Sequence, residues 1–137
     1  MSARRWIRRG YHSVNAYLVA EEVEPLIEFL CDVFGGAERG ERELRDDGTI
    51  EHAEVQIGDS VVMLSGATAE HPARPSVSFA YVEDVDAVFR RAVEAGATDF
   101  RKPMDWPWGD RVAGFHDPAD NRWWIATCVS TEASGAT

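Results

Sequence analysis

The stretch SVNAYLVAEEVEPLIEFLCDVFGGA, residues 13–37, has a counterpart in SVSFAYVEDVDAVFRRAVEAGAT, residues 76–98. Each stretch begins with a Ser-Val run typical of a strand and passes an acidic break. Each then continues with apolar residues at helical spacing and stops at a glycine followed by alanine. The repetition predicts that the chain uses one strand-helix unit twice.

The apolar positions predict one amphipathic helix in each stretch. Gly35-Gly36 ends the first helix and Gly96 follows the second, while Asp84 has the side chain of an N-cap. The spacing assigns one core-facing side to each helix. Its members are Val23, Leu26, Ile27, Leu30 and Phe34 in the first helix, and Val85, Val88, Phe89, Ala92 and Val93 in the second.

Alternating segments separated by turn residues follow each helix and predict three strands per half. They cover 38–44, 50–57 and 60–65 in the first half, and 98–102, 111–116 and 122–128 in the second. Each half is therefore predicted to be βαβββ. The expected organisation is one structural domain with a basic N-terminal segment (1–10), a first module (11–65), a linker (66–75), a second module (76–128) and a flexible tail (129–137).

This arrangement resembles the vicinal oxygen chelate superfamily of glyoxalases, bleomycin-resistance proteins and extradiol dioxygenases. The resemblance covers about Tyr11 to Cys128. Its most specific segments are HAEVQIGDSVVMLS (52–65) and DPADNRWWIAT (117–127), which are similar to the glyoxalase-like branch without assigned substrates. The resemblance implies an α+β fold in which two βαβββ modules form curled mixed sheets around a cavity. It also implies a homodimer whose modules pair within or across chains.

The resemblance further implies four metal-ligand positions, which fall at Asn15, Met63, Val77 and Trp124. Metal-dependent members carry His, Gln or Glu there. Valine has no lone pair, the indole of tryptophan only donates, and the methionine thioether is too soft for a hard divalent cation. We therefore expect no metal at these positions and no cofactor.

A set of polar residues leaves an enzymatic alternative open. Strand alternation puts His52, Glu54 and Gln56 on the face opposite Ala53. An offset of about 62 residues between the halves matches Glu54 with His116, so His52, Glu54 and His116 are expected to converge. Such a set could hold a metal by another route or act in general acid–base catalysis. The competing interpretation of His52 and Glu54 is a cross-strand ladder exposed to water.

Tryptophans are concentrated between residues 106 and 124. Trp123 and Trp124 are adjacent on a strand and must point to opposite faces, and the resemblance places Trp124 inward. Trp106 and Trp108 either cover the cavity or pack a loop or subunit interface. Flat rings and a thioether suit a planar or hydrophobic ligand. The expected ligand-binding residues are Asn15, Tyr17, His52, Glu54, Met63, Phe79, Tyr81, Trp108, Arg111 and Trp124.

The 137 residues include 14 basic and 24 acidic side chains, giving a net charge of −10. This charge argues against nucleic acid and anionic membranes as partners, although Arg4, Arg5, Arg8 and Arg9 make the N-terminus basic. No apolar run approaches the roughly 18 residues of a membrane span, and no secretory signal is present, so we expect a cytoplasmic protein. Two distant cysteines without CxxC spacing predict reduced thiols.

These observations lead to three hypotheses. The first is a metal-independent small-molecule binding protein of the glyoxalase/bleomycin-resistance type. It would sequester a hydrophobic or aromatic ligand, and the acidic charge would favour a cationic one. The alternative is a metal-dependent or acid–base lyase, isomerase or dioxygenase that uses His52, Glu54 and His116. The third is a dimeric scaffold whose cavity is filled by its own aromatic side chains.

Overall fold

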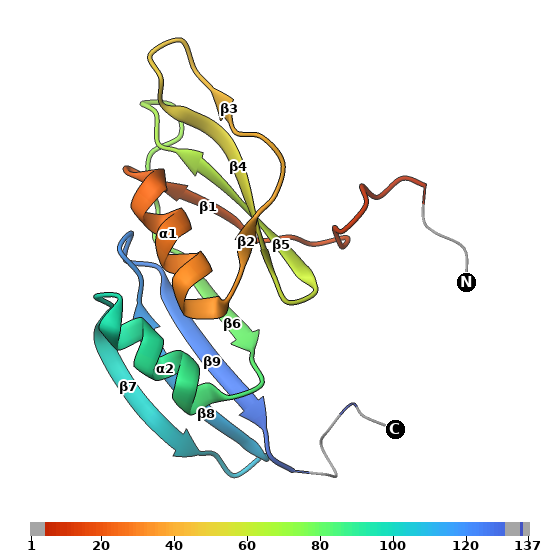
Figure 1. Ribbon diagram of the computed structural model, residues 1–137, viewed down its shortest axis with the longest axis vertical. Helices are drawn as coiled ribbons and strands as arrows, with labels where there is room; N and C mark the ends of the chain where they lie inside the picture. Colours follow the sequence, from red (N-terminus) through yellow and green to blue (C-terminus); the bar gives the residue numbers. More distant parts are fainter. Residues whose placement is uncertain (1–4, 131–134, 136–137) are drawn as a thin grey trace.

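A computed structural model describes residues 5–130 and Gly135 (Figure 1). The predicted duplication is confirmed, because strands and helices follow the same order in both halves. In chain order the elements are β1 (Tyr17–Ala20), α1 (Val23–Phe34), β2 (Ala37–Glu38), β3 (Glu43–Leu44), β4 (Ile50–Ile57), β5 (Ser60–Gly66), β6 (Val77–Tyr81), α2 (Val85–Glu94), β7 (Thr98–Asp105), β8 (Asp110–His116) and β9 (Arg122–Cys128).

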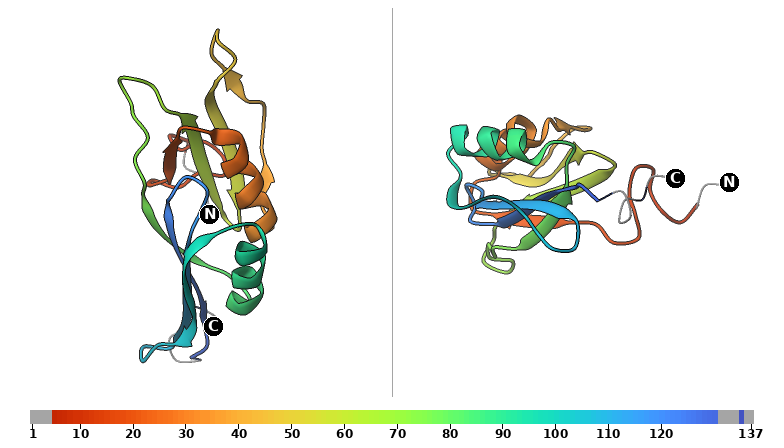
Figure 2. Two further views of the ribbon diagram at one scale, coloured as in Figure 1. Left: turned by 90° about the vertical axis from the view of Figure 1, so that its left-hand side faces the viewer. Right: turned by 90° about the horizontal axis from the view of Figure 1, so that it is seen from below.

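Two mixed sheets give the α+β architecture that the sequence predicts. The first has the order β1-β5-β4-β2, with β3 also paired to β4, and the second has the order β6-β9-β8-β7. In each sheet the first strand runs parallel to the last strand of its module, and the remaining pairs are antiparallel. Neither sheet closes on itself. Both helices lie on the same side of the sheets, which leaves the opposite faces without a helical layer (Figure 2).

The helices end where the sequence predicts. Gly35 adopts a left-handed φ of 67° and closes α1, and the Asp84 carboxylate accepts a hydrogen bond of 3.1 Å from the Ala87 N–H at the start of α2. The predicted inner faces are buried with three exceptions: Phe34 and Phe89 are half-buried, and Val93 is exposed. The apolar stripe of α2 is therefore narrower than its spacing predicts.

One continuous core joins the two modules. α1 packs against α2, and the Phe29 and Phe115 rings meet edge to face with centroids 5.9 Å apart. Phe34 of the first module lies 5.0 Å from Trp123 of the second, measured between ring centroids. These contacts set the relative position of the modules, which stand end to end along the long axis of the molecule (Figure 1).

Several strand boundaries differ from the prediction. The single strand expected over 38–44 is split into β2 and β3, with Gly40 at a φ of 68° between them. The first strand begins at Tyr17, four residues later than the Ser-Val run suggests. β7 continues to Asp105 and its pairing with β8 is irregular on either side of Arg101. β8 begins one residue earlier than predicted, and β9 has the predicted bounds.

The linker starts at Gly66, the last residue of β5, and Arg74 within it forms an isolated bridge with Val19. Arg4 and most of the predicted tail lie outside the described residues. Cys31 and Cys128 carry free thiols. Within residues 5–130, neither helix is long and apolar enough to cross a membrane. The module boundaries and the cytoplasmic location stay predictions.

Candidate functional site

The outer face of the second sheet, opposite the helices, is aromatic. Alternate residues of the edge strand β6 project from it, and the side chains of Phe79 and Tyr81 are 48% and 65% exposed. Their rings meet edge to face at 5.3 Å between centroids. Trp124 lies beside Phe79 in the neighbouring strand β9. The exposed rings of Phe79 and Tyr81 and the half-buried ring of Trp124 make up a surface that is called the aromatic face below.

The loop between β7 and β8 adds two tryptophans to this surface. The Trp106 ring lies 6.2 Å from the Trp124 ring and 4.6 Å from the Trp108 ring, measured between centroids. Trp108 itself is 59% exposed. Trp106 therefore packs within the loop, as one of the two predictions states, and it also connects the loop to the aromatic face.

Trp124 is held flat against the sheet by a glycine that the sequence analysis overlooked. Gly114 pairs with Trp124 across β8 and β9. A Cβ atom at position 114 would lie only 2.8 Å from two carbons of the indole ring, Cε3 and Cζ3. The indole also contacts Arg122, whose guanidinium carbon is 5.2 Å from the ring centroid, a cation–π distance. Contacts with Gly114 and Arg122 thus fix the position of the Trp124 ring on the outer face of the sheet.

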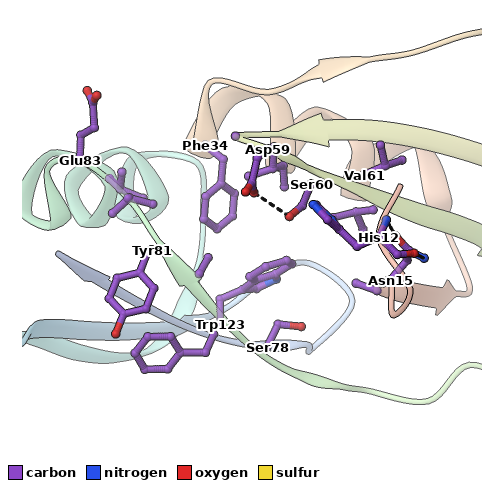
Figure 3. A pocket seen from close by; sticks show the side chains of 18 of the residues that line it. His12, Asn15, Phe34, Asp59, Ser60, Val61, Ser78, Tyr81, Glu83 and Trp123 are labelled. Carbon is purple, nitrogen blue, oxygen red and sulfur yellow. Dashed lines mark hydrogen bonds between the residues drawn. The ribbon is translucent and has the colours of Figure 1, made fainter. Parts of the chain in front are cut away.

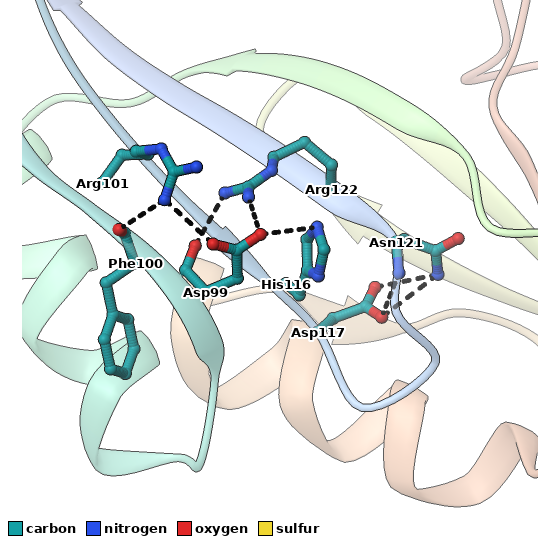
Figure 4. A network of polar contacts seen from close by, with 7 residues as sticks. All are labelled: Asp99, Phe100, Arg101, His116, Asp117, Asn121 and Arg122. Atoms are coloured by element: carbon teal, nitrogen blue, oxygen red, sulfur yellow. Dashed lines mark hydrogen bonds and ion pairs between the residues drawn. The ribbon is translucent and has the colours of Figure 1, made fainter.

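A polar network fixes Arg122 at one end of the aromatic face (Figure 4). Its guanidinium donates to the carboxylate and to the backbone carbonyl of Asp99. Arg101 donates to the same carboxylate at 2.9 Å, and the His116 ring lies 3.5 Å from it. Desolvation acts to raise the pKa of Asp99, but Arg101, Arg122 and His116 outweigh it and lower the pKa. This carboxylate is therefore an anchor for three basic side chains.

The predicted convergence of His52, Glu54 and His116 is wrong. In the first sheet Glu54 pairs with Met63, and in the second sheet Gly114 pairs with Trp124. Glu54 therefore corresponds to Gly114, because the offset between the halves is 60 residues in these strands instead of 62. His116 lies in the Asp99 network of the second module. Among the described residues, no three His, Cys, Asp or Glu side chains gather in a way that could hold a metal.

The outer face of the first sheet carries a cluster around Glu54, which is only 6% exposed. His52 lies 2.8 Å from the carboxylate, and Arg8 and Arg39 each lie 3.5 Å from it. Both guanidinium groups also stand over the Tyr11 ring, at 5.5 and 5.4 Å. The exposed polar ladder expected for Glu54 is therefore wrong, because the N-terminal segment covers it.

The environment of Glu54 favours its ionised form. Burial acts to raise its pKa, but the neighbouring Tyr11 hydroxyl, His52 and Arg8 act in the opposite direction and the net shift is downward. The Tyr11 hydroxyl is itself buried, and no hydrogen bond of ordinary geometry is found for it among the described residues. Burial raises the pKa of Tyr11, as does the neighbouring carboxylate. The ionised Glu54 carboxylate therefore holds the N-terminal segment against the sheet through its ion pair with Arg8.

The residues at the four implied metal positions do not fit a divalent ion. The Asn15 side chain exchanges hydrogen bonds with the His12 backbone, at 2.9 Å to the N–H and 2.7 Å to the carbonyl, in the turn before β1. Asn15 is thus not on the first strand as predicted. Met63, Val77 and Trp124 supply no oxygen or nitrogen lone pair. The donor set offers no basis for metal chemistry at these positions.

A cleft of about 1060 Å³ lies between the modules (Figure 3). Phe34 and Trp123 project into it, with the hairpin at Asp59 and Ser60 on one side and β6 on the other. Its volume lies just above the range typical of small-molecule sites, roughly 300–1,000 Å³. Three of the predicted ligand-binding residues line it, namely Asn15, Phe79 and Tyr81. His12 also lines it.

Arg111, which the sequence analysis places among the expected ligand-binding residues, is held in ion pairs. Its guanidinium lies 3.2 Å from Asp86 of α2 and 3.1 Å from Asp105 of β7, so it is turned toward the helical side of the sheet. Strand alternation could have revealed this, because Arg111 shares its face with Ala113 and Phe115, which are buried in the core. Arg111 is a structural ion-pairing residue.

Comparison with known proteins identifies relatives of the whole folded region. A model of the Glyoxalase/Bleomycin resistance protein/Dioxygenase superfamily matches residues 11–125. An uncharacterized protein of Mycobacterium bovis is 32% identical over 122 residues, covering 81% of this chain and 80% of the relative.

Solved structures share the fold at lower identity. TioX from Micromonospora sp. ML1 has a TM-score of 0.69 at 24% identity, covering 85% of this chain and 99% of TioX. TnmS3, an antibiotic binding protein from Streptomyces sp. CB03234, has a TM-score of 0.64 at 21% identity, covering 85% of this chain and 97% of TnmS3. At these identities the likeness concerns the fold alone.

Proposed function

Because the chain belongs to the Glyoxalase/Bleomycin resistance protein/Dioxygenase superfamily, we propose that it is a metal-independent protein that sequesters a hydrophobic or aromatic small molecule. The mechanism is stoichiometric capture by ring stacking, with no bond made or broken. TnmS3 is described as an antibiotic binding protein, and the proposal assigns this chain a related role.

The observation that carries the proposal is the aromatic face. The rings of Phe79 and Tyr81 contact each other, those of Trp106 and Trp124 contact each other, and Phe79 and Trp124 are neighbours across β6 and β9. Gly114 and Arg122 contact Trp124. Large apolar side chains that a monomer leaves exposed together mark a binding surface. A planar ligand stacked on Trp124 gains contact area without first having to order the ring.

We also propose that a second copy of the chain covers the aromatic face and completes the site. Tyr17 and Met63 occupy the positions of the first sheet that correspond to Phe79 and Trp124, and Tyr17 is exposed. Sedimentation equilibrium tests this arrangement, and the expected species has twice the 15.2 kDa mass of the chain. A monomer at all concentrations would overturn the dimer but leave an open aromatic face. The predicted ligand roles of Asn15 and His52 stay predictions.

Titration of the uniformly ¹⁵N-labelled chain with planar aromatic compounds tests the proposal, because its five tryptophans report on separate places. Trp124, Trp106 and Trp108 belong to the aromatic face and its loop, whereas the Trp123 indole N–H is buried and donates to Asp117 at 2.8 Å. We expect saturable shifts of the first three indole signals at micromolar ligand. Shifts confined to Trp123 would place the ligand in the cleft instead. No shift at any tryptophan would overturn the proposal.

The third hypothesis, a scaffold filled by its own aromatic side chains, makes a different prediction. It requires that replacement of Trp124 by alanine lowers stability by about 3–5 kcal/mol and changes no ligand affinity. Under the binding proposal, Trp124→Ala abolishes the shifts at Trp106 and Trp108 when ligand is added. The two outcomes are distinguishable in one titration.

A further inference from the structure

We propose that a hollow at the end of the aromatic face is a subsite for an organic ammonium group of the ligand. The proposal rests on the proposed function and narrows the ligand class. The hollow has a volume of about 350 Å³ and is lined by Tyr81, Trp108, Asp110, Cys128 and Gly135. It lies where β8 begins and β9 ends, and it shares only Tyr81 with the residues that line the cleft between the modules.

Asp110 places a buried carboxyl group without a basic partner in this hollow. The residue is only 5% exposed, and one carboxylate oxygen, Oδ2, accepts a hydrogen bond of 2.8 Å from the Tyr81 hydroxyl. No Lys, Arg or His among the described residues forms an ion pair with Asp110. A buried carboxylate in that state is costly unless a cation or several donors compensate it.

The other buried acidic side chains of the two sheets are compensated within the chain. Glu54 is surrounded by Arg8, Arg39 and His52. Asp117 accepts hydrogen bonds from two backbone N–H groups, from the Asn121 amide and from the Trp123 indole. Asp110 receives one neutral side-chain donor. The missing positive charge is therefore expected from outside the described chain.

The walls of the hollow suit an alkylammonium ion. Tyr81 and Trp108 present exposed aromatic rings beside the carboxylate, and ring faces attract organic cations through their quadrupoles. The hydrogen bond to Asp110 raises the pKa of Tyr81, so the phenol stays protonated and neutral at pH 7. Carboxylate and rings together supply both charge and dispersion contacts for a methylated ammonium group.

The position of Asp110 also gives the aromatic face a direction. Asp110 pairs with Cys128 at one end of β8 and β9, whereas His116 pairs with Arg122 at the other end. The negative end of the face is thus at the hollow, and the positive end is at the Arg122 network. A ligand stacked on Trp124 is expected to point its ammonium group toward Asp110 and electron-rich groups toward Arg122.

The test compares choline with 3,3-dimethylbutan-1-ol, a neutral molecule of the same shape, using the ¹⁵N-labelled full chain. The readouts are the Trp108 indole signal and the backbone signals of Tyr81 and Asp110. We expect choline to shift them saturably and to bind at least about tenfold more tightly than the alcohol. Asp110→Asn keeps the shape and an oxygen acceptor for Tyr81, and it is expected to remove this preference. Glu94→Gln, on an exposed carboxylate of α2, makes the same charge change as a control.

Equal affinity for choline and the alcohol overturns the subsite, as does an Asp110→Asn variant that is folded and retains the preference. The comparison of the two probes on the unmodified chain needs no variant, so a poorly folded Asp110→Asn protein leaves the test intact. If planar aromatic compounds shift Trp124 but choline shifts nothing, the subsite is wrong and the proposed function stands. If neither class of probe binds, both are overturned.

Discussion

Replacement of Gly114 by alanine is expected to displace the indole ring of Trp124, which packs directly against this glycine. The new methyl carbon would lie 2.8 Å from Cε3 and Cζ3 of the indole. Non-bonded carbons prefer about 3.5–4.0 Å, so the ring must move by roughly 1 Å or tilt away from the sheet. Gly114 is not among the glycines with positive φ, so alanine adds no backbone strain.

Two opposing contributions determine how much Gly114→Ala changes the free energy of unfolding. Overpacking of a well-filled site costs about 1–3 kcal/mol. Replacing glycine by alanine also restricts the unfolded chain, which stabilises the protein by about 0.4–1 kcal/mol. The clash is the larger contribution, because the neighbouring Arg122 guanidinium is also only 3.2 Å from the added carbon. We expect a net loss of about 0.5–2 kcal/mol in the free energy of unfolding.

Urea denaturation measures this free energy, and the Trp124 indole signal in ¹⁵N spectra reports the position of the ring. Gly135→Ala is the control, since nothing lies within 4 Å of a Cβ atom at that position. Adding Trp124→Leu to the Gly114→Ala variant removes the clash, so the two substitutions are expected to be non-additive. A Gly114→Ala protein of unchanged stability with an unmoved Trp124 signal would refute the proposed seat of the ring.

Three further predictions concern buried or paired side chains. Asp117→Ala leaves the Trp123 indole and two backbone N–H groups without their acceptor, and we expect a loss of about 2–4 kcal/mol in urea denaturation. The folded-state pKa of Glu54 is below its ordinary value of 4.5, so its ionisation contributes stability above pH 4.5 that is lost as the pH falls. The stability difference between the unmodified chain and Glu54→Gln should therefore shrink below that pH, and a constant difference would contradict it. Arg111→Ala removes two partly exposed ion pairs, so we expect at most about 1 kcal/mol, reduced by salt, and unchanged binding of planar aromatic compounds.

The helices and most strands could be predicted because local chemistry determines them. The apolar spacing of α1, the glycine at its end and the cap at Asp84 act over a few residues each, and the structure retains all three. Residues 38–44 could not be predicted to split, because the break at Gly40 depends on how β2 and β3 each pair with β4. Pairing of that kind is a property of the tertiary structure.

The site was predictable where strand alternation decides the direction of a side chain. As that rule requires, Trp123 and Trp124 point to opposite faces: Trp123 is buried in the core and Trp124 shares the outer face with Phe79 and Tyr81, whereas the resemblance places Trp124 inward. The predicted convergence of His52, Glu54 and His116 is wrong because the turn between β8 and β9 is longer than the turn between β4 and β5. The offset between corresponding residues of the two halves is therefore not constant. The burial of Glu54 depends on Arg8, which is 46 residues away in sequence, and no local pattern indicates such a contact.

The core shared by α1 and α2 has a consequence for any attempt to divide the chain at its linker. An isolated second half would lose the Phe29 and Phe34 rings that cover Phe115 and Trp123. Each fragment would expose the apolar surface that the other half covers in the intact chain. The stability of the reassembled pair would then depend on fragment concentration. In the intact chain the linker keeps the two modules together, and they share one core. The two halves are therefore expected to unfold in one transition.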